Sequence, residues 1–123
     1  MKPLTEFRNL FIKDITIIPY FIDTRLPAHR QIWANLQSII KVLSRLSNET
    51  ILTDKQIKNY ANQTEELINY ILDDSGTYDI LEIELSWYIL QLLEQYEEKA
   101  LELELYEQCE NIKRYKKIYL FNE

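Results

Sequence analysis

Apolar residues recur every three or four positions along the first half of the chain, and this spacing predicts amphipathic helices. One helix is predicted near 28–47, where the apolar face comprises Trp33, Leu36, Ile40 and Leu43. We expect Asp23 or Thr24 to cap this helix and Pro27 to lie in its first turn, where a missing N–H is harmless.

A second helix is predicted near 54–73. Thr53 and Gln56 have the spacing of a capping box, in which the threonine oxygen accepts a hydrogen bond from the amide of Gln56 while the glutamine side chain reaches back to the cap. We expect this helix to close over Asp73–Gly76, because glycine adopts the left-handed conformation that often follows a helix.

The first 22 residues give a mixed pattern. Leu4, Phe7, Leu10 and Phe11 repeat with helical spacing, which predicts a short first helix. The run from Ile15 to Ile22 is β-branched and aromatic with a proline inside it, so it is either an extended buried segment or a second short helix. We favour an extended segment packed on the bundle.

Neither proline nor glycine occurs from Thr77 to Lys116. A single helix over this segment would be roughly 60 Å long. That is long for a domain of this size, so we expect a bend or break near Glu97–Ala100. The alternating residues from Leu101 to Leu105 are predicted to be helical, because glutamate and leucine favour helices.

Two apolar stripes run along this C-terminal region, nearly opposite each other on a helical wheel. One contains Leu81, Leu85, Tyr88, Leu92, Tyr96, Leu103 and Tyr106. The other contains Ile83, Trp87, Leu90, Leu101, Leu105, Cys109 and Ile112. Such a region either lies inside the bundle or keeps one side for another chain, and we favour burial inside the bundle.

Composition also favours helices, because 123 residues contain one glycine, Gly76, whereas sheets use glycine in turns and bulges. The length suits a single domain over residues 1–123. The predicted fold is therefore all-α. It is a helical bundle with a short N-terminal helix or extended segment and a long acidic C-terminal helix or helix pair.

Charge is distributed unevenly along the chain. Residues 1–52 have a net charge of +3, residues 53–123 have −9, and the segment from Glu65 to Glu110 alone has −13. A negative field of this kind repels nucleic acid and favours a basic protein partner. The alternative is a solvated helical face without a partner.

The residue types argue against most catalytic chemistry. One histidine, His29, and one cysteine, Cys109, are too few for a di-iron bundle or a Cys/His zinc site, and one glycine cannot form a phosphate-binding loop. We interpret His29 as a surface or capping residue near a helix start. No enzyme activity, metal or cofactor is expected.

A lone Cys109 cannot form an intramolecular disulfide, which fits a reducing compartment. The longest apolar stretch, Leu10 to Ile22, is interrupted by Lys13, Asp14 and Pro19 and is too short to span a bilayer. We expect a soluble cytoplasmic protein.

The candidate site is a partner-binding surface on which acids alternate with tyrosines, since tyrosine is common in interface hot spots. Its predicted residues are Glu82, Glu84, Glu94, Glu97, Glu98, Glu102, Glu104, Glu107, Glu110, Tyr88, Tyr96 and Tyr106. The alternative for the tyrosines is a position at the edge of the core.

The chain resembles the small acidic helical immunity proteins of colicin-type and contact-dependent inhibition systems. The shared features are its size, its lack of cofactor chemistry and an acid-rich helical half with the aromatic residues Trp87, Tyr88, Tyr96 and Tyr106. The resemblance is at the level of this class and transfers no site residue. It implies a cognate toxin domain, usually basic, that is occluded by one-to-one binding. Two other classes stay open: a phage or plasmid anti-defence protein that mimics nucleic-acid charge, and a helical adaptor or secretion chaperone.

Overall fold

The computed structural model describes residues 2–75 and 78–121, and the side chains of residues 2–73 and 82–119. Over these residues the chain forms helices and no β-strand, which confirms the predicted all-α fold. The elements are α1 (Pro3–Thr16), α2 (Pro27–Leu43), the 3₁₀ helix η1 (Ser44–Ser47), α3 (Asp54–Ser75), α4 (Tyr78–Glu102) and α5 (Tyr106–Phe121).

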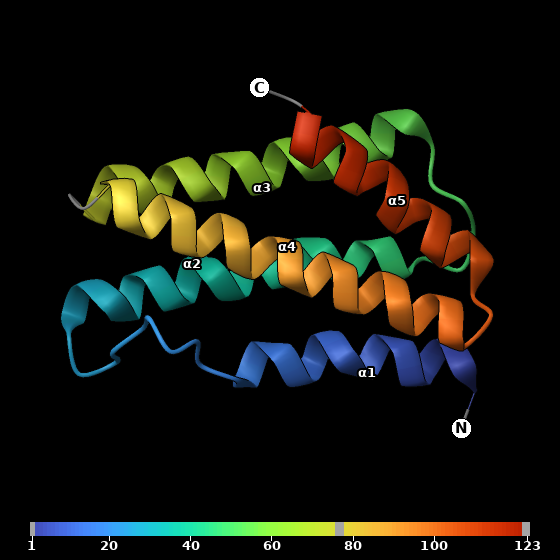
Figure 1. The fold of residues 1–123 in the computed structure, drawn as a ribbon, viewed down its shortest axis with the longest axis horizontal. Helices are drawn as coiled ribbons and strands as arrows, with labels where there is room; N and C mark the ends of the chain where they lie inside the picture. Colours follow the sequence, from blue (N-terminus) through green and yellow to red (C-terminus); the bar gives the residue numbers. More distant parts are fainter. Residues whose placement is uncertain (1, 76–77, 122–123) are drawn as a thin grey trace.

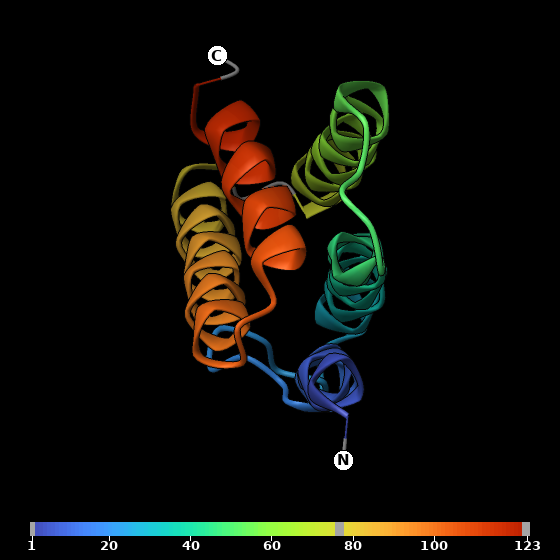
Figure 2. The ribbon, with the colours of Figure 1, turned by 90° about the vertical axis from the view of Figure 1, so that its right-hand side faces the viewer.

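The helices form two layers that α1 closes along one side (Figures 1 and 2). One layer is the pair α2 and α3, and the other is the pair α4 and α5. The helix α1 contacts both α2 and α4, while α3 contacts α4 and α5 across the layers. Every helix therefore has one side available for the core and one side facing outward.

Large apolar side chains from all five helices fill the core. Taken in order from α1 to α5, fully buried examples are Phe7, Leu36, Ile57, Leu85 and Tyr115. Full burial of an aliphatic or aromatic side chain stabilises a fold by about 1.5–3 kcal/mol. Within α1, Phe7 also meets Phe11 edge to face, with the ring centroids 5.4 Å apart.

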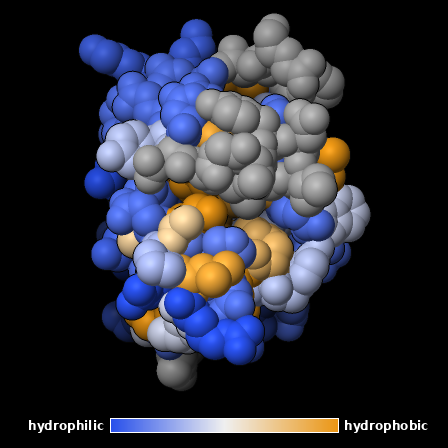
Figure 3. Space-filling model, turned by 90° about the vertical axis from the view of Figure 1, so that its left-hand side faces the viewer, coloured by the Kyte–Doolittle hydropathy of each residue, from blue (hydrophilic) through white to orange (hydrophobic). Residues whose placement is uncertain are grey.

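The segment after α1 is only partly packed on the bundle. Residues 17–26 contain no helix, and Pro19 and Ile22 are buried as the sequence predicts. By contrast, Ile17 and Tyr20 are 48% and 83% exposed. The end of the bundle seen in Figure 3 shows apolar surface among hydrophilic atoms.

The predicted capping of α2 is wrong, because residues 23–26 form a turn of their own. The amide of Leu26 donates to the carbonyl of Asp23 at 3.0 Å, which brings the Asp23 carboxylate beside the guanidinium of Arg25 at 2.9 Å. The N-cap of α2 is Leu26, which makes no side-chain hydrogen bond. Pro27 does lie in the first turn of α2, and η1 ends at Ser47, as predicted.

The capping box of α3 is confirmed. The amide of Gln56 donates to the Thr53 hydroxyl at 3.1 Å, and the amide of Thr53 donates to Oε1 of Gln56 at 2.8 Å. The helix extends to Ser75, and the predicted role of Gly76 lies outside the described residues.

The C-terminal region is a pair of helices, but the break falls later than predicted. The helix α4 runs through Glu97–Ala100 and ends at Glu102, and α5 begins at Tyr106. The prediction of a helix over Leu101 to Leu105 is therefore wrong from residue 103 onward. Local helix propensity is overridden because the chain must turn here to pack α5 back along α4.

A Schellman motif makes this turn. The amide of Leu105 donates to the carbonyl of Ala100 at 2.8 Å, and the amide of Glu104 donates to the carbonyl of Leu101 at 3.1 Å. Glu104 has a φ of 60°, a left-handed conformation that glycine adopts without steric cost. A glutamate at this position hides the turn from sequence analysis.

Buried polar side chains join α5 to the segment between η1 and α3. Oδ1 of Asn111 accepts a hydrogen bond from the amide of Leu52 at 2.9 Å, and its Nδ2 donates to the carbonyls of Leu46 and Thr50, each at 3.3 Å. Asn111 itself is fully buried. One side chain thus satisfies three backbone groups that are remote from it in sequence.

Two neighbours on α5 extend this contact. Nε2 of Gln108 donates to the carbonyl of Asn48 at 2.7 Å, and Arg114 donates to the carbonyl of Leu52 at 2.6 Å. Arg114 also pairs with Asp54 at the start of α3. The first half of α5 is therefore held in place by a row of side chains spaced three residues apart.

Glu104→Gly should raise the free energy of unfolding by about 1 kcal/mol, because it removes the Cβ that opposes the left-handed conformation. Chemical denaturation measures the change. The control is Glu110→Gly inside α5, which should lower stability by about 0.5–1 kcal/mol. A less stable Glu104→Gly protein would contradict the assigned turn.

Asn111→Leu should lower the free energy of unfolding by about 2–3 kcal/mol, because the buried amide of Leu52 and two carbonyls lose their partner. The same substitution at the exposed Asn62 of α3 should change stability by less than about 0.5 kcal/mol. Urea unfolding of both variants makes the comparison, and equal effects would argue against the hydrogen-bond contribution.

Candidate partner-binding surface

Of the two apolar stripes predicted in the C-terminal region, only one lies in the core along α4. The buried face of α4 comprises three residues of the first stripe, Leu85, Leu92 and Tyr96, together with Ile89, Leu93 and Ala100. On the opposite face, Ile83, Trp87 and Leu101 are 69%, 57% and 56% exposed. Burial of both stripes inside the bundle is therefore wrong for these three residues. The second stripe is buried only on α5, at Cys109 and Ile112.

A group of exposed acids covers the C-terminal half of α4, the turn after it and the first half of α5. Over the part of the chain that the structure describes, none of its members forms an ion pair. The group consists of Glu94, Glu98, Glu104, Glu107 and Glu110. We call it the acidic group. Its negative charge therefore has no ion-pair partner among the side chains of residues 2–73 and 82–119.

Two other predicted acids are paired with lysines of the same chain. Glu97 pairs with Lys116 of α5 at 3.0 Å, and both side chains are mostly buried. Glu102 lies 3.5 Å from Lys99, which also pairs with Glu6 of α1 at 3.3 Å. Glu97 thus joins α4 to α5, whereas Glu102 is paired within α4, and both acids are less available to a partner.

Two further predicted residues, Glu84 and Tyr88, contact the segment after α1. The Tyr20 hydroxyl donates a hydrogen bond to Glu84, and the ring of Phe21 meets that of Tyr88 edge to face with centroids 5.9 Å apart. Tyr88 is half-buried, and burial raises the pKa of its hydroxyl to about 12. Tyr88 therefore lies at the edge of the core, which is the alternative that the sequence left open.

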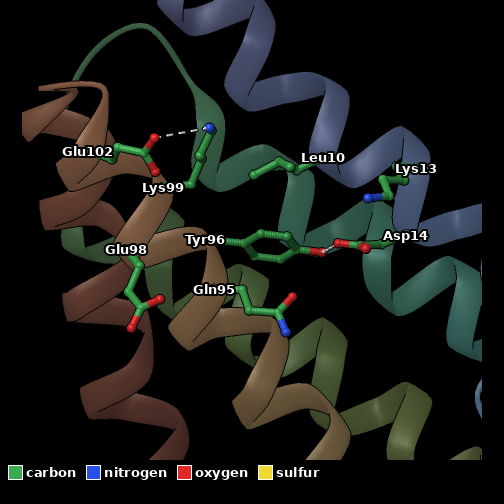
Figure 4. Close-up of a pocket in the computed structure, with 8 residues that line it drawn as sticks. All are labelled: Leu10, Lys13, Asp14, Gln95, Tyr96, Glu98, Lys99 and Glu102. Atoms are coloured by element: carbon green, nitrogen blue, oxygen red, sulfur yellow. Dashed lines mark hydrogen bonds and ion pairs between the residues drawn. The ribbon is translucent and has the colours of Figure 1, made fainter.

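Tyr96 is a core residue, so its prediction as an interface residue is wrong. It is 1% exposed, and its ring lies 4.1 Å from that of Phe11 between centroids. Its hydroxyl crosses from α4 to α1 and donates to Oδ2 of Asp14 at 2.8 Å (Figure 4). Tyr96 belongs to the first of the two stripes defined by the sequence pattern, but the pattern does not tell which stripe faces inward.

A shallow hollow between α1 and α4 surrounds this contact (Figure 4). Three of its charged groups are engaged, since Asp14 accepts from Tyr96 and Lys99 pairs with Glu102, whereas Lys13 and Glu98 form no ion pair among the described residues. Burial raises the pKa of Asp14, and the hydrogen bond from Tyr96 and the charge of Lys13 offset this only in part. The hollow thus serves the joint between the two helices.

Besides the acidic group, two predicted residues are available at the surface. Tyr106, the first residue of α5, is 61% exposed and lies in sequence between the acids of the turn and those of α5. Glu82 is exposed and lines an apolar groove at the other end of α4.

This groove lies between α3, α4 and α5 and has a volume of about 530 Å³. It is lined by Ile68, Glu82, Ile83, Ser86, Trp87, Leu90 and Tyr119. The sequence pattern indicated Ile83, Trp87 and Leu90 as part of one stripe. It gave no sign of Ile68 or Tyr119, which come from other helices and join the groove only through the fold.

The described residues give little support for a metal site, for a functional histidine or for a membrane span. No group of three or more His, Cys, Asp or Glu side chains among them is placed to hold a metal ion. Nδ1 of His29 accepts a hydrogen bond from the amide of Asp23 at 2.9 Å, as expected of a residue near a helix start. None of the described helices is long and apolar enough to cross a membrane.

Comparison of the chain with protein-family models, with curated proteins and with solved structures finds no match.

Asp14→Asn should gain stability relative to the wild type as the pH rises from about 4 to about 7. A raised folded-state pKa means that the protonated carboxyl favours folding, so the stability that Asp14 provides is lost as pH rises through that pKa. Asparagine keeps an acceptor for Tyr96 without the charge.

Urea unfolding across this pH range measures the difference between the two proteins, with Glu49→Gln as the control for an exposed acid. A difference that stays constant, or that shrinks as the pH rises, would contradict the assignment.

Proposed function

We propose that the chain is a protein inhibitor that binds and neutralises a basic partner, as an immunity protein neutralises a nuclease toxin. The observation that carries this proposal is the acidic group, Glu94, Glu98, Glu104, Glu107 and Glu110, which is exposed and lacks ion pairs among the described residues. It retains most of the acidic surface expected from the sequence on α4 and α5.

The acids of this group carry like charges. Neighbouring carboxylates repel one another and reduce the stability of the folded chain. A basic partner removes this repulsion on binding, and its opposite field speeds the encounter. An acidic group without ion pairs among the described residues is therefore well suited to recognising a basic surface.

Exposed aromatic side chains lie beside the acids. Tyr106 is next to the turn at Glu104, and Trp87 lies two helical turns before Glu94 on α4. Tyrosine and tryptophan are enriched among interface residues that dominate binding energy. The surface thus combines long-range attraction with rigid apolar anchors.

The proposed site is narrower than the one expected from the sequence. It keeps the acidic group, Tyr106 and Glu82. It leaves out Glu84 and Tyr88, which contact the segment after α1, and Glu97 and Glu102, which have lysine partners. Such an inhibitor would act in the cytoplasm, and a buried, reduced Cys109 suits that compartment.

Charge reversal tests the proposal. The double variant Glu94→Lys with Glu98→Lys should slow association with a basic partner by about tenfold and flatten its salt dependence, because surface charges act chiefly on the encounter. The partner is obtained by affinity capture on the immobilised wild-type chain from the native host, identified by mass spectrometry and purified for stopped-flow measurement.

The matched control is Glu49→Lys with Glu66→Lys, which changes the net charge equally at exposed positions outside the acidic group. This control should associate within about threefold of the wild-type rate, since only the overall charge has changed. Equal rates for the two double variants, or a partner with no basic surface, would refute the proposal.

A further inference from the structure

The α4 side of the apolar groove and two members of the acidic group, Glu94 and Glu98, lie along one exposed face of α4. Ile83, Trp87, Glu94 and Glu98 are separated by four, seven and four residues, so they share a side of the helix. The face is apolar in its first half, where Ile83 and Trp87 are 69% and 57% exposed, and acidic in its second half.

We infer that this face binds an amphipathic basic helix of the partner, with apolar anchors in the groove and Lys or Arg side chains on Glu94 and Glu98. The inference rests on the proposed function and specifies the element of the partner that is recognised. It also gives the groove a role that the acidic group alone does not require.

Dimensions support a helical occupant. Trp87 and Glu94 are seven residues apart and Trp87 and Glu98 eleven, which is about 10–16 Å along the helix axis. A helix lying along α4 covers this distance in two to three turns. The occupant therefore has apolar residues at one end and basic residues two to three turns away, as in helix-in-groove recognition.

Charge complementarity selects this occupant over a second copy of the chain. A two-fold dimer through the same face would bring equivalent surfaces together, each carrying Glu82, Glu94 and Glu98. Like charges across such an interface oppose association. Glu82 lines the groove itself, so a basic residue can be accommodated at the apolar end as well.

A peptide titration tests the inference directly. The probe is a fluorescein-labelled 18-residue helix of about five turns, with leucine at i, i+3, i+4 and i+7 of its first half and lysine on the same face of its second half. The matched peptide has glutamate in place of lysine. Fluorescence anisotropy should show saturable binding of the lysine peptide that weakens as salt rises. The glutamate peptide should bind at least about tenfold more weakly.

Variants then locate the site. Trp87→Ala should weaken binding of the lysine peptide by about 30-fold, as expected for loss of a central aromatic anchor. The control Tyr70→Ala removes another exposed aromatic, 60% exposed on α3, and should change affinity by less than about twofold. Circular dichroism checks that both variants stay folded, which their exposed positions favour.

Three results would overturn the inference. They are equal binding of the two peptides, no binding of either at about 1 mM, and a Trp87-dependent dimer in analytical ultracentrifugation. None of these results affects the outcome of the charge-reversal experiment on the captured partner. That experiment alters Glu94 and Glu98 and does not depend on what binds the groove. Failure of this inference is therefore distinguishable from failure of the proposed function.

Discussion

The hydrogen bonds between Asn111 and the backbone around Leu52 are the contact on which the arrangement of the second layer depends. They fix the first half of α5 against the segment that joins η1 to α3. With α5 held there, the left-handed turn at Glu104 determines how α4 lies beside it. The Tyr115 hydroxyl adds a second link, donating to Thr64 of α3 at 2.6 Å. Burial makes such bonds costly to lose, because the freed groups cannot reach water.

The ion pairs of the molecule lie mainly at joints between helices. Glu6 and Lys99 join α1 to α4, Glu97 and Lys116 join α4 to α5, and Asp54 and Arg114 join α3 to α5. The basic residues of the C-terminal half are partly used at these joints, which leaves the outer acids of α4 and α5 unneutralised. The same ion pairs thus stabilise the bundle and leave the acidic group without partners among the described residues.

Much of the fold could be predicted from local patterns. The helical spacing, the capping box at Thr53 and the near absence of glycine each act within a few residues, so they can be read without knowing the fold. The errors arose where another contact, local or distant, overrides the expected pattern. Asp23 pairs with Arg25 instead of capping α2, and the turn at Glu104 interrupts a segment of strong helix formers. Tyr96 was assigned to a surface because it alternates with acids in the sequence, and no local pattern tells which stripe of α4 faces inward.

The sequence by itself determined that the chain is helical, where most helices lie and that the C-terminal half is acidic, because propensity, periodicity and charge are local properties. Only the tertiary structure decided which stripe of α4 is buried, since that depends on where α1 and α5 pack. It also decided which acids are paired, and it brought Ile68 and Tyr119 beside Trp87. These features join residues far apart in the chain, and no local pattern encodes such distances.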